Sequence, residues 1–255
     1  MNRLKYIIGS IISFPLIPIL YFQGKAIRKT VPQLPEATGI EGEARSLGSS
    51  NCTRLLVLGE STVAGVGVKT HEEGFAGTFA KEISINTKQL VQWKVYARSG
   101  YTAKRVRFKI VPKISEHQFD MIVIGLGGND AFTLNSPKKW SAQIQLLIDE
   151  LRAKFGNVPI YFTNMPPIKE FPAFTKTIKF VVGNLVELLG EQLQRVVRTN
   201  PNVYYNSEVI TIDKWTKRLN INAKENQFFS DGVHPSKFTY QVWAKEMAKF
   251  VSSNS

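Results

Sequence analysis

Residues 55–62 read Leu-Leu-Val-Leu-Gly-Glu-Ser-Thr, an apolar run that ends in a turn of small and polar residues. A continuous apolar run of this length, closed by glycine, is typical of a strand that is covered on both faces of a sheet. Ser61 follows the carboxyl end of this strand, which is where open α/β sheets bind their ligands. A serine at this place is either a nucleophile or the N-cap of the next helix, and the stretch by itself favours the cap.

Strands and helices alternate along the rest of the chain. Beside the strand at 54–59, the pattern predicts strands at 91–97, 120–126, 158–163 and 202–206. It predicts helices over 73–86, 102–114, 137–155, 174–199 and 236–251. Strands that alternate with helices form βαβ units, in which a parallel sheet lies between two helical layers. The predicted fold class is therefore α/β, a three-layer α/β/α sandwich.

Three more polar stretches fall at the ends of predicted strands or just before a helix. They are Arg-Ser-Gly-Tyr-Thr at 98–102, Gly-Leu-Gly-Gly-Asn-Asp at 125–130, and Ser-Asp-Gly-Val-His-Pro at 230–235. The carboxyl ends of parallel strands meet at one edge of a sheet, so we expect Ser61, Gly100 and Asn129 to converge there. Each stretch taken alone also fits a turn or a helix cap.

The chemistry that suits these residues is acyl transfer. A serine hydroxyl is a weak nucleophile and needs an adjacent base, for which His234 is the candidate. Asp231, three residues earlier, is the candidate carboxylate that orients the imidazole ring. The tetrahedral intermediate carries an oxyanion, and its candidate donors are the backbone N–H groups of Ser61 and Gly100 and the side-chain amide of Asn129.

These motifs resemble those of the SGNH/GDSL hydrolases, and the resemblance spans residues 54–250. It rests on four short blocks that occur in the family's order: Gly-Glu-Ser at 59–61, Gly100, Gly-Gly-Asn-Asp at 127–130, and Asp-Gly-Val-His at 231–234. The family usually has Asp where this chain has Glu60. Because Glu60 is not the triad acid, we expect the chemistry to survive, but the hydrogen bonding of the turn stays open.

The resemblance implies a flavodoxin-like fold around a five-stranded parallel sheet. It also implies that Ser61 is the nucleophile, His234 the base and Asp231 the orienting acid. The oxyanion hole would consist of Ser61, Gly100 and Asn129. We expect no cofactor.

The chain begins with an apolar segment. Residues 6–22 carry no charge and approach the length of a membrane span, and Arg3 and Lys5 precede them as in a signal sequence. No small-x-small cleavage site follows, which favours an uncleaved membrane anchor over residues 1–29. A cleaved signal peptide and a buried or interfacial helix are the alternatives. Positive charges flank both sides almost equally, and we expect an exported catalytic domain, periplasmic or extracellular.

Residues 30–53 are predicted to be a linker, because they contain Pro32, Pro35, several Gly and Ser, and no regular period. The catalytic domain is then expected over 54–255. Cys52 is the only cysteine and has no Cys or His partner at metal-ligand spacing, so we predict no disulfide and no zinc site. The net charge of +13 is spread along the chain without a nucleic-acid motif, so no nucleic-acid partner is expected.

One further stretch of the sequence bears on the substrate. Residues 164–174 form a Pro-rich, aromatic stretch after the fourth predicted strand, and it is either a packed connection or an apolar wall for an acyl chain. We predict a serine esterase that acts on an acetyl, short-acyl or lipid-like ester, of a small molecule or a glycan. The alternatives are an acyltransferase with the same triad and a non-catalytic binding module on the same fold.

Overall fold

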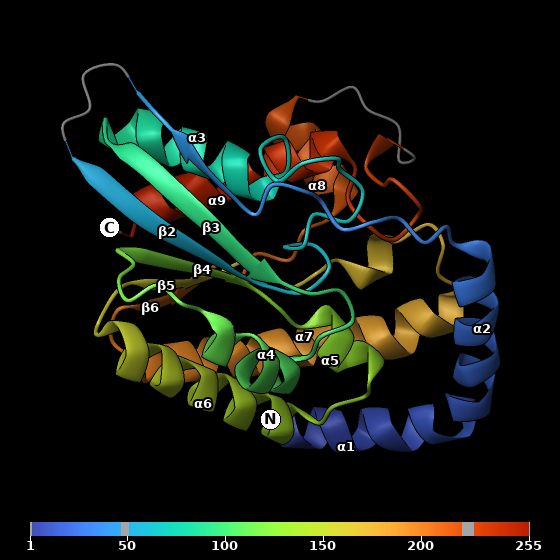
Figure 1. Ribbon diagram of the computed structural model, residues 1–255. Helices are drawn as coiled ribbons and strands as arrows, with labels where there is room; N and C mark the ends of the chain where they lie inside the picture. Colours follow the sequence, from blue (N-terminus) through green and yellow to red (C-terminus); the bar gives the residue numbers. More distant parts are fainter. Residues whose placement is uncertain (1, 47–50, 221–226, 255) are drawn as a thin grey trace.

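The computed structural model describes residues 2–46, 51–220 and 227–254. Within them, a sheet of six strands in the order β1-β3-β2-β4-β5-β6 carries helices on both faces (Figure 1). Strands β2 to β6 run parallel and β1 pairs antiparallel with β3 at the edge. Their bounds are Glu41–Ala44 (β1), Cys52–Gly59 (β2), Leu90–Ala97 (β3), Met121–Gly125 (β4), Ile160–Phe162 (β5) and Val203–Tyr205 (β6). Residues 47–50 of the predicted linker, and 221–226 and 255 of the predicted catalytic domain, lie outside the described residues.

Two hydrophobic cores lie on the two faces of the sheet. Leu55 and Val57 of β2 pack into the core under α3 (Phe75–Thr87) and α9 (Lys237–Ser252). Leu56 and Leu58 point to the opposite core, under α4 (Ala103–Lys109), α6 (Pro137–Phe155) and α7 (Lys176–Arg198). Because both faces are covered, successive residues of β2 are apolar without alternation. The predicted three-layer α/β/α sandwich is confirmed.

Polar caps begin the helices that follow the loops at the carboxyl edge of the sheet. In five helices the N-cap hydroxyl accepts a hydrogen bond from the backbone N–H three residues later, which satisfies a donor that the helix itself leaves free. The five capping residues are Thr102 before α4, Ser136 before α6, Thr175 before α7, Thr211 before α8 (Ile212–Leu219) and Ser236 before α9. The loops before α7 and α9 therefore end at defined points beside the site.

The sheet has one strand more than the sequence predicts. Strand β1 lies inside the predicted linker and adds an antiparallel edge to the five parallel strands. Its sequence, Glu-Gly-Glu-Ala, has no apolar alternation, so no pattern signals it. Gly42 permits the pairing, because a Cβ at this residue would lie 2.5 Å from the ring of Trp93.

Short helical segments modify the predicted pattern elsewhere. The helix expected over 102–114 is divided into α4 and the 3-10 turn η2 (Val111–Lys113), because Pro112 has no N–H to continue the helix. Two further segments carry no strong period in the sequence, α5 (Gly128–Phe132) and the 3-10 turn η3 (Ile168–Glu170).

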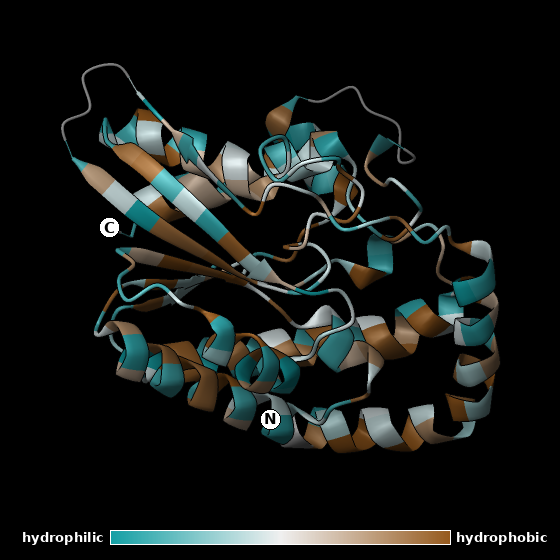
Figure 2. Cartoon of the chain, viewed as in Figure 1, coloured by the Kyte–Doolittle hydropathy of each residue, from teal (hydrophilic) through white to brown (hydrophobic). Residues whose placement is uncertain are grey.

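The N-terminal segment forms α1 (Asn2–Ser13), the 3-10 turn η1 (Phe14–Leu16) and α2 (Ile17–Thr30). Figure 1 shows that α1 and α2 meet at an angle, and the break coincides with Pro15 and Pro18. Residues Leu4–Thr30 are long and apolar enough to cross a membrane, with a mean hydropathy of 1.7 over an 18-residue stretch. Figure 2 shows hydrophobic residues along both helices of this segment, and most of their apolar side chains are exposed. The segment also contacts α7, through an ion pair of 3.3 Å between Lys5 and Glu191.

Candidate active site

The ends of β3, β2 and β4 lie side by side. Gly59, the last residue of β2, is in register with Ala97 of β3 and Gly125 of β4. The fit at this point is close, because a Cβ at Gly59 would lie 2.3 Å from the carbonyl oxygen of Gly125. Ser61, Gly100 and Asn129 follow these strand ends by two, three and four residues, so they lie at one edge of the sheet as predicted.

Ser61 lies in a series of turns and caps no helix. Residues 61–67 are turns, and the next helix, α3, begins at Phe75 with Gly74 as its N-cap. The turns are closed by hydrogen bonds from the Ala64 N–H to the Glu60 carbonyl (2.8 Å) and from the Val66 N–H to the Ser61 carbonyl (3.2 Å). The N-cap interpretation of Ser61 therefore does not hold, and its half-buried side chain stands at the sheet edge.

Glu60 ties the serine turn to the Gly-Asn stretch after β4. Its buried carboxylate accepts hydrogen bonds from the backbone N–H groups of Gly128 (2.7 Å) and Asn129 (2.9 Å). It also accepts one from the side-chain amide of Asn129 at 2.5 Å. An amide nitrogen carries two hydrogens, so the second hydrogen of Asn129 is left for another acceptor. These bonds settle the local structure that the Asp-to-Glu departure had left open.

Asp130 fixes the start of α4, close to Gly100. Its carboxylate accepts hydrogen bonds from the backbone N–H of Ala103 and the side-chain amide of Asn135, both at 2.8 Å. Burial raises the pKa of Asp130 to about 6. Burial also raises the pKa of Glu60 to about 7. The hydrogen bonds from Asn129 and Gly128 lower this pKa, and the negative charge of Asp130 raises it further. Two buried carboxylates with raised pKa values thus support the strand-end loops.

Asp231 and His234 are in direct contact. Asp231 Oδ2 lies 2.7 Å from His234 Nδ1, while Oδ1 accepts hydrogen bonds from the backbone N–H groups of Val233 (2.9 Å) and His234 (2.7 Å). Burial alone would raise the pKa of Asp231, but the bonds from His234 and Val233 outweigh it and lower that pKa. An ionised carboxylate only accepts, so Nδ1 carries a proton, and in the neutral imidazole the lone pair is on Nε2.

The loop that carries His234 packs on the turns that follow Ser61. Ser230 Oγ lies 3.2 Å from the Gly67 carbonyl oxygen and 3.0 Å from that of Pro235, and a Cβ at Gly67 would lie 2.7 Å from Ser230 Oγ. The Tyr240 hydroxyl of α9 donates to the Val66 carbonyl (2.8 Å). Within the described residues, no hydrogen bond joins Ser61 to His234. The backbone N–H groups of Ser61 and Gly100 also have no acceptor among the residues that the structure describes. Unliganded enzymes often show such loose catalytic contacts and free donors.

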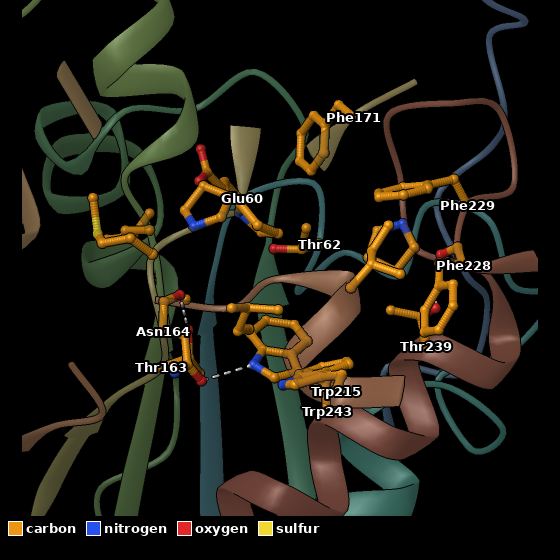
Figure 3. A pocket seen from close by; sticks show the side chains of 18 residues that line it. Glu60, Thr62, Thr163, Asn164, Phe171, Trp215, Phe228, Phe229, Thr239 and Trp243 are labelled. Carbon is orange, nitrogen blue, oxygen red and sulfur yellow. Dashed lines mark hydrogen bonds between the residues drawn. The ribbon is translucent and has the colours of Figure 1, made fainter. Parts of the chain in front are cut away.

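An apolar cavity opens beside the serine turn (Figure 3). Glu60 and Thr62, which flank Ser61, line one side of it, and Pro235, which follows His234, lines another. Its remaining walls are mostly aromatic and apolar, from Met165, Pro166, Pro167, Phe171, Ile210, Ile212, Trp215, Phe228, Phe229 and Trp243. The Pro-rich stretch 164–174 thus contributes residues to this wall.

From the sequence, Glu60 is visible only as a departure from the Asp that the family usually has, and no function is assigned to it. Because its pKa in the folded protein is about 7 and its ordinary value is 4.5, the folded state holds more protons than the unfolded state between these values. Stability is therefore expected to fall as the pH rises from 4.5 to 7, by up to about 3 kcal/mol from this group. Glu60→Gln should flatten this part of the profile, measured by urea unfolding at pH 5 and 7.5.

Glu43→Gln is the matched control, because the Glu43 side chain is largely exposed and lies 3.7 Å from Arg45 in a surface ion pair. It should leave the pH dependence of unfolding as in the wild type. If Glu60→Gln and Glu43→Gln gave the same slope as the wild type, Glu60 would not take up a proton in this range.

Residues 57–242 match the model of the GDSL-like lipase/acylhydrolase family. No curated protein matches the chain. Similar solved structures include TesA (TM-score 0.59, 16% identity, covering 79% of this chain and 99% of that one). The acetyl xylan esterase AlAXEase is also similar (TM-score 0.57, 15% identity, covering 78% of this chain and 99% of that one). So is a family 3 carbohydrate esterase of Clostridium thermocellum (TM-score 0.58, 17% identity, covering 80% of this chain and 97% of that one). Because these sequence identities are 15–17%, the similarity to the three structures shows a shared fold alone.

Proposed function

This chain belongs to the GDSL-like lipase/acylhydrolase family of ester hydrolases, and we propose that Ser61, His234 and Asp231 carry out its reaction. The observation that carries the proposal is the 2.7 Å contact between His234 Nδ1 and a buried, ionised Asp231. The loop that holds this pair packs on the turns that follow Ser61. A nucleophile, a base and an acid that orients the base are the three groups that acyl transfer by serine requires.

In the proposed reaction, His234 Nε2 takes the proton of the Ser61 hydroxyl while Oγ attacks the ester carbonyl. The tetrahedral intermediate collapses to an acyl-serine, and the imidazolium gives the proton to the leaving alkoxide, which departs as an alcohol. Water then attacks the acyl-serine with His234 again as the base, which releases the carboxylic acid and restores the serine. The ionised Asp231 stabilises the imidazolium that forms in both halves.

The proposed oxyanion hole consists of the N–H groups of Ser61 and Gly100 and the second amide hydrogen of Asn129. Its support is that the two backbone donors have no acceptor among the described residues and that Glu60 holds Asn129 through two bonds. Donors fixed before the reaction stabilise the developing oxyanion without reorganisation, and each is typically worth about 3–4 kcal/mol of barrier.

The apolar cavity beside Ser61 supports an acyl group longer than acetyl. Each additional CH₂ that leaves water contributes about 0.8 kcal/mol, which is about a fourfold gain in kcat/KM. We therefore expect p-nitrophenyl butyrate and octanoate to be hydrolysed with higher kcat/KM than the acetate, and all three activities to need Ser61. Ile212→Trp, which adds volume to the cavity wall, should reduce turnover of octanoate more than that of acetate.

Val209→Trp is the matched control for the cavity variant. Val209 is exposed and is not one of the residues that line the apolar cavity. It should leave the chain-length profile unchanged. A preference for acetate in the wild type, untouched by Ile212→Trp, would assign the enzyme to O-acetyl esters instead, including those of glycans.

The second part of the proposal concerns the apolar N-terminal segment and a membrane. We infer that residues 1–29 anchor the catalytic domain, with the domain on the exported side. Support comes from the exposed apolar side chains of the segment, among them Ile8, Ile11, Phe14 and Phe22. The full chain should then stay with membranes at alkaline pH, whereas a chain without residues 2–29 should be released; release of both would refute the anchor.

A further inference from the structure

Glu36 contacts the loop that carries Gly100. Its Oε1 accepts a hydrogen bond from the backbone N–H of Ser99 at 2.7 Å, and its Oε2 accepts one from the Arg98 guanidinium at 3.0 Å. Ser99 directly precedes Gly100, whose φ of +77° lies in the left-handed region. One carboxylate thus holds two consecutive residues at the entrance to this turn.

Few other contacts hold the turn. The Arg98 N–H donates to the Gly59 carbonyl at 3.2 Å, and the Tyr101 N–H closes the turn on the Arg98 carbonyl at 3.3 Å. Arg98, Ser99 and Gly100 are exposed, and a Cβ built on Gly100 would meet no atom within 4 Å. Packing therefore does little to fix the orientation of the Gly100 peptide. Within the described residues, the bond from the Ser99 N–H to Glu36 is the shortest that residues 98–101 make.

Glu36 is itself held against the turns that follow Ser61. The next residue, Ala37, is buried and donates its N–H to the Ala64 carbonyl at 2.9 Å. The Thr38 N–H donates to the Lys69 carbonyl at 3.0 Å. Ala37 also lies close to Gly65, because a Cβ at Gly65 would be 2.6 Å from the Cβ of Ala37. Figure 1 shows this stretch, between α2 and β1, crossing the carboxyl edge of the sheet.

We propose that Glu36 is a positioning residue for the oxyanion hole, which orients the Gly100 N–H by fixing the peptide before it. This inference rests on the proposed function, in which Gly100 is an oxyanion donor. The segment 36–38 joins the loop of the nucleophile to the loop of this donor, so the two keep their relative positions. The residue acts through Ser99 and does not itself touch the substrate.

The test compares Glu36→Ala, Glu36→Gln and Glu43→Gln in the full chain, with p-nitrophenyl butyrate as the substrate. Glu36→Ala should lower kcat about tenfold at an unchanged KM, because a misplaced oxyanion donor weakens the transition state alone. Glu36→Gln keeps an oxygen that accepts from Ser99 and should stay within about twofold of the wild type. Glu43→Gln, the same charge change in the same segment, should have no effect.

A readout of the loop itself accompanies the kinetics. Hydrogen exchange at the Ser99 amide should be faster in Glu36→Ala than in the wild type and near the wild-type rate in Glu36→Gln. If Glu36→Ala fails to fold, Glu36→Asp replaces it, since Asp keeps the charge but withdraws the carboxylate by one methylene group. Glu36→Asp should then show the lower kcat and the faster exchange.

Two outcomes would overturn the inference. An unchanged kcat in Glu36→Ala, or an equal loss in Glu36→Gln and Glu36→Ala, would remove the role of the Ser99 bond while leaving the serine mechanism intact. Folded wild-type protein without turnover that depends on Ser61 would instead refute the proposed function on which the inference rests.

Discussion

Ser61→Ala and His234→Ala are each expected to lower kcat for p-nitrophenyl butyrate by on the order of 10⁵-fold or more, with the fold intact. Ser61→Ala removes the atom that forms the acyl-enzyme, and His234→Ala removes the base without which that atom stays protonated. Because the two groups act as a unit, the double variant should lose no more than either single variant. The measurement is steady-state hydrolysis at pH 7.5, with circular dichroism to verify folding.

Ser115→Ala and His117→Ala are the matched controls for these variants. Both residues are exposed and lie in the connection before β4, away from the sheet edge that carries Ser61. They should keep wild-type turnover. Residual activity in Ser61→Ala close to that of the wild type would show that another group attacks the ester.

Asp231→Asn is expected to lower kcat by roughly 10⁴-fold while preserving most of the loop. Asp231 accepts three hydrogen bonds, one from His234 Nδ1 and two from backbone N–H groups. An asparagine amide turned toward Nδ1 would donate, which places the imidazole proton on Nε2 and leaves no lone pair to accept the proton of Ser61. The loss should appear in kcat, with KM changed little.

Asp213→Asn provides the control for the change from carboxylate to amide. Asp213 is exposed on α8 and pairs with Lys217 one helical turn away, so its variant should behave as the wild type. If Asp231→Asn retained more than about a tenth of wild-type kcat, the orienting role of Asp231 in the proposed triad would be wrong.

The sequence predicts the sandwich well because its strong signals are local. The continuous apolar run of β2 is typical of a strand that is buried on both faces, and the helical period of α7 marks the one face that it buries. Both patterns can be read without a structure. The convergence of Ser61, Gly100 and Asn129 follows from parallel strands, because strand polarity alone brings their ends together. Membership of a hydrolase family leaves the non-catalytic module without support.

The parts that sequence reasoning missed depend on backbone contacts and long-range packing. Strand β1 and Glu36 lie in a stretch with prolines, glycines and no period, and both interact mainly through backbone groups of distant residues. Nothing in the composition of residues 30–53 distinguishes such a stretch from a linker. Glu60 was visible as a departure from the family's pattern, but its three bonds to Gly128 and Asn129 required the structure.

The central claim is that Ser61 attacks the substrate and carries the acyl group. It is tested most directly by reaction of the full chain with an alkyl fluorophosphonate, followed by mass spectrometry of the peptides. We predict a single adduct on Ser61 in the wild type, and its loss in His234→Ala, where no base activates the hydroxyl. A folded wild-type protein that forms no adduct, or forms it on another residue, would contradict the account.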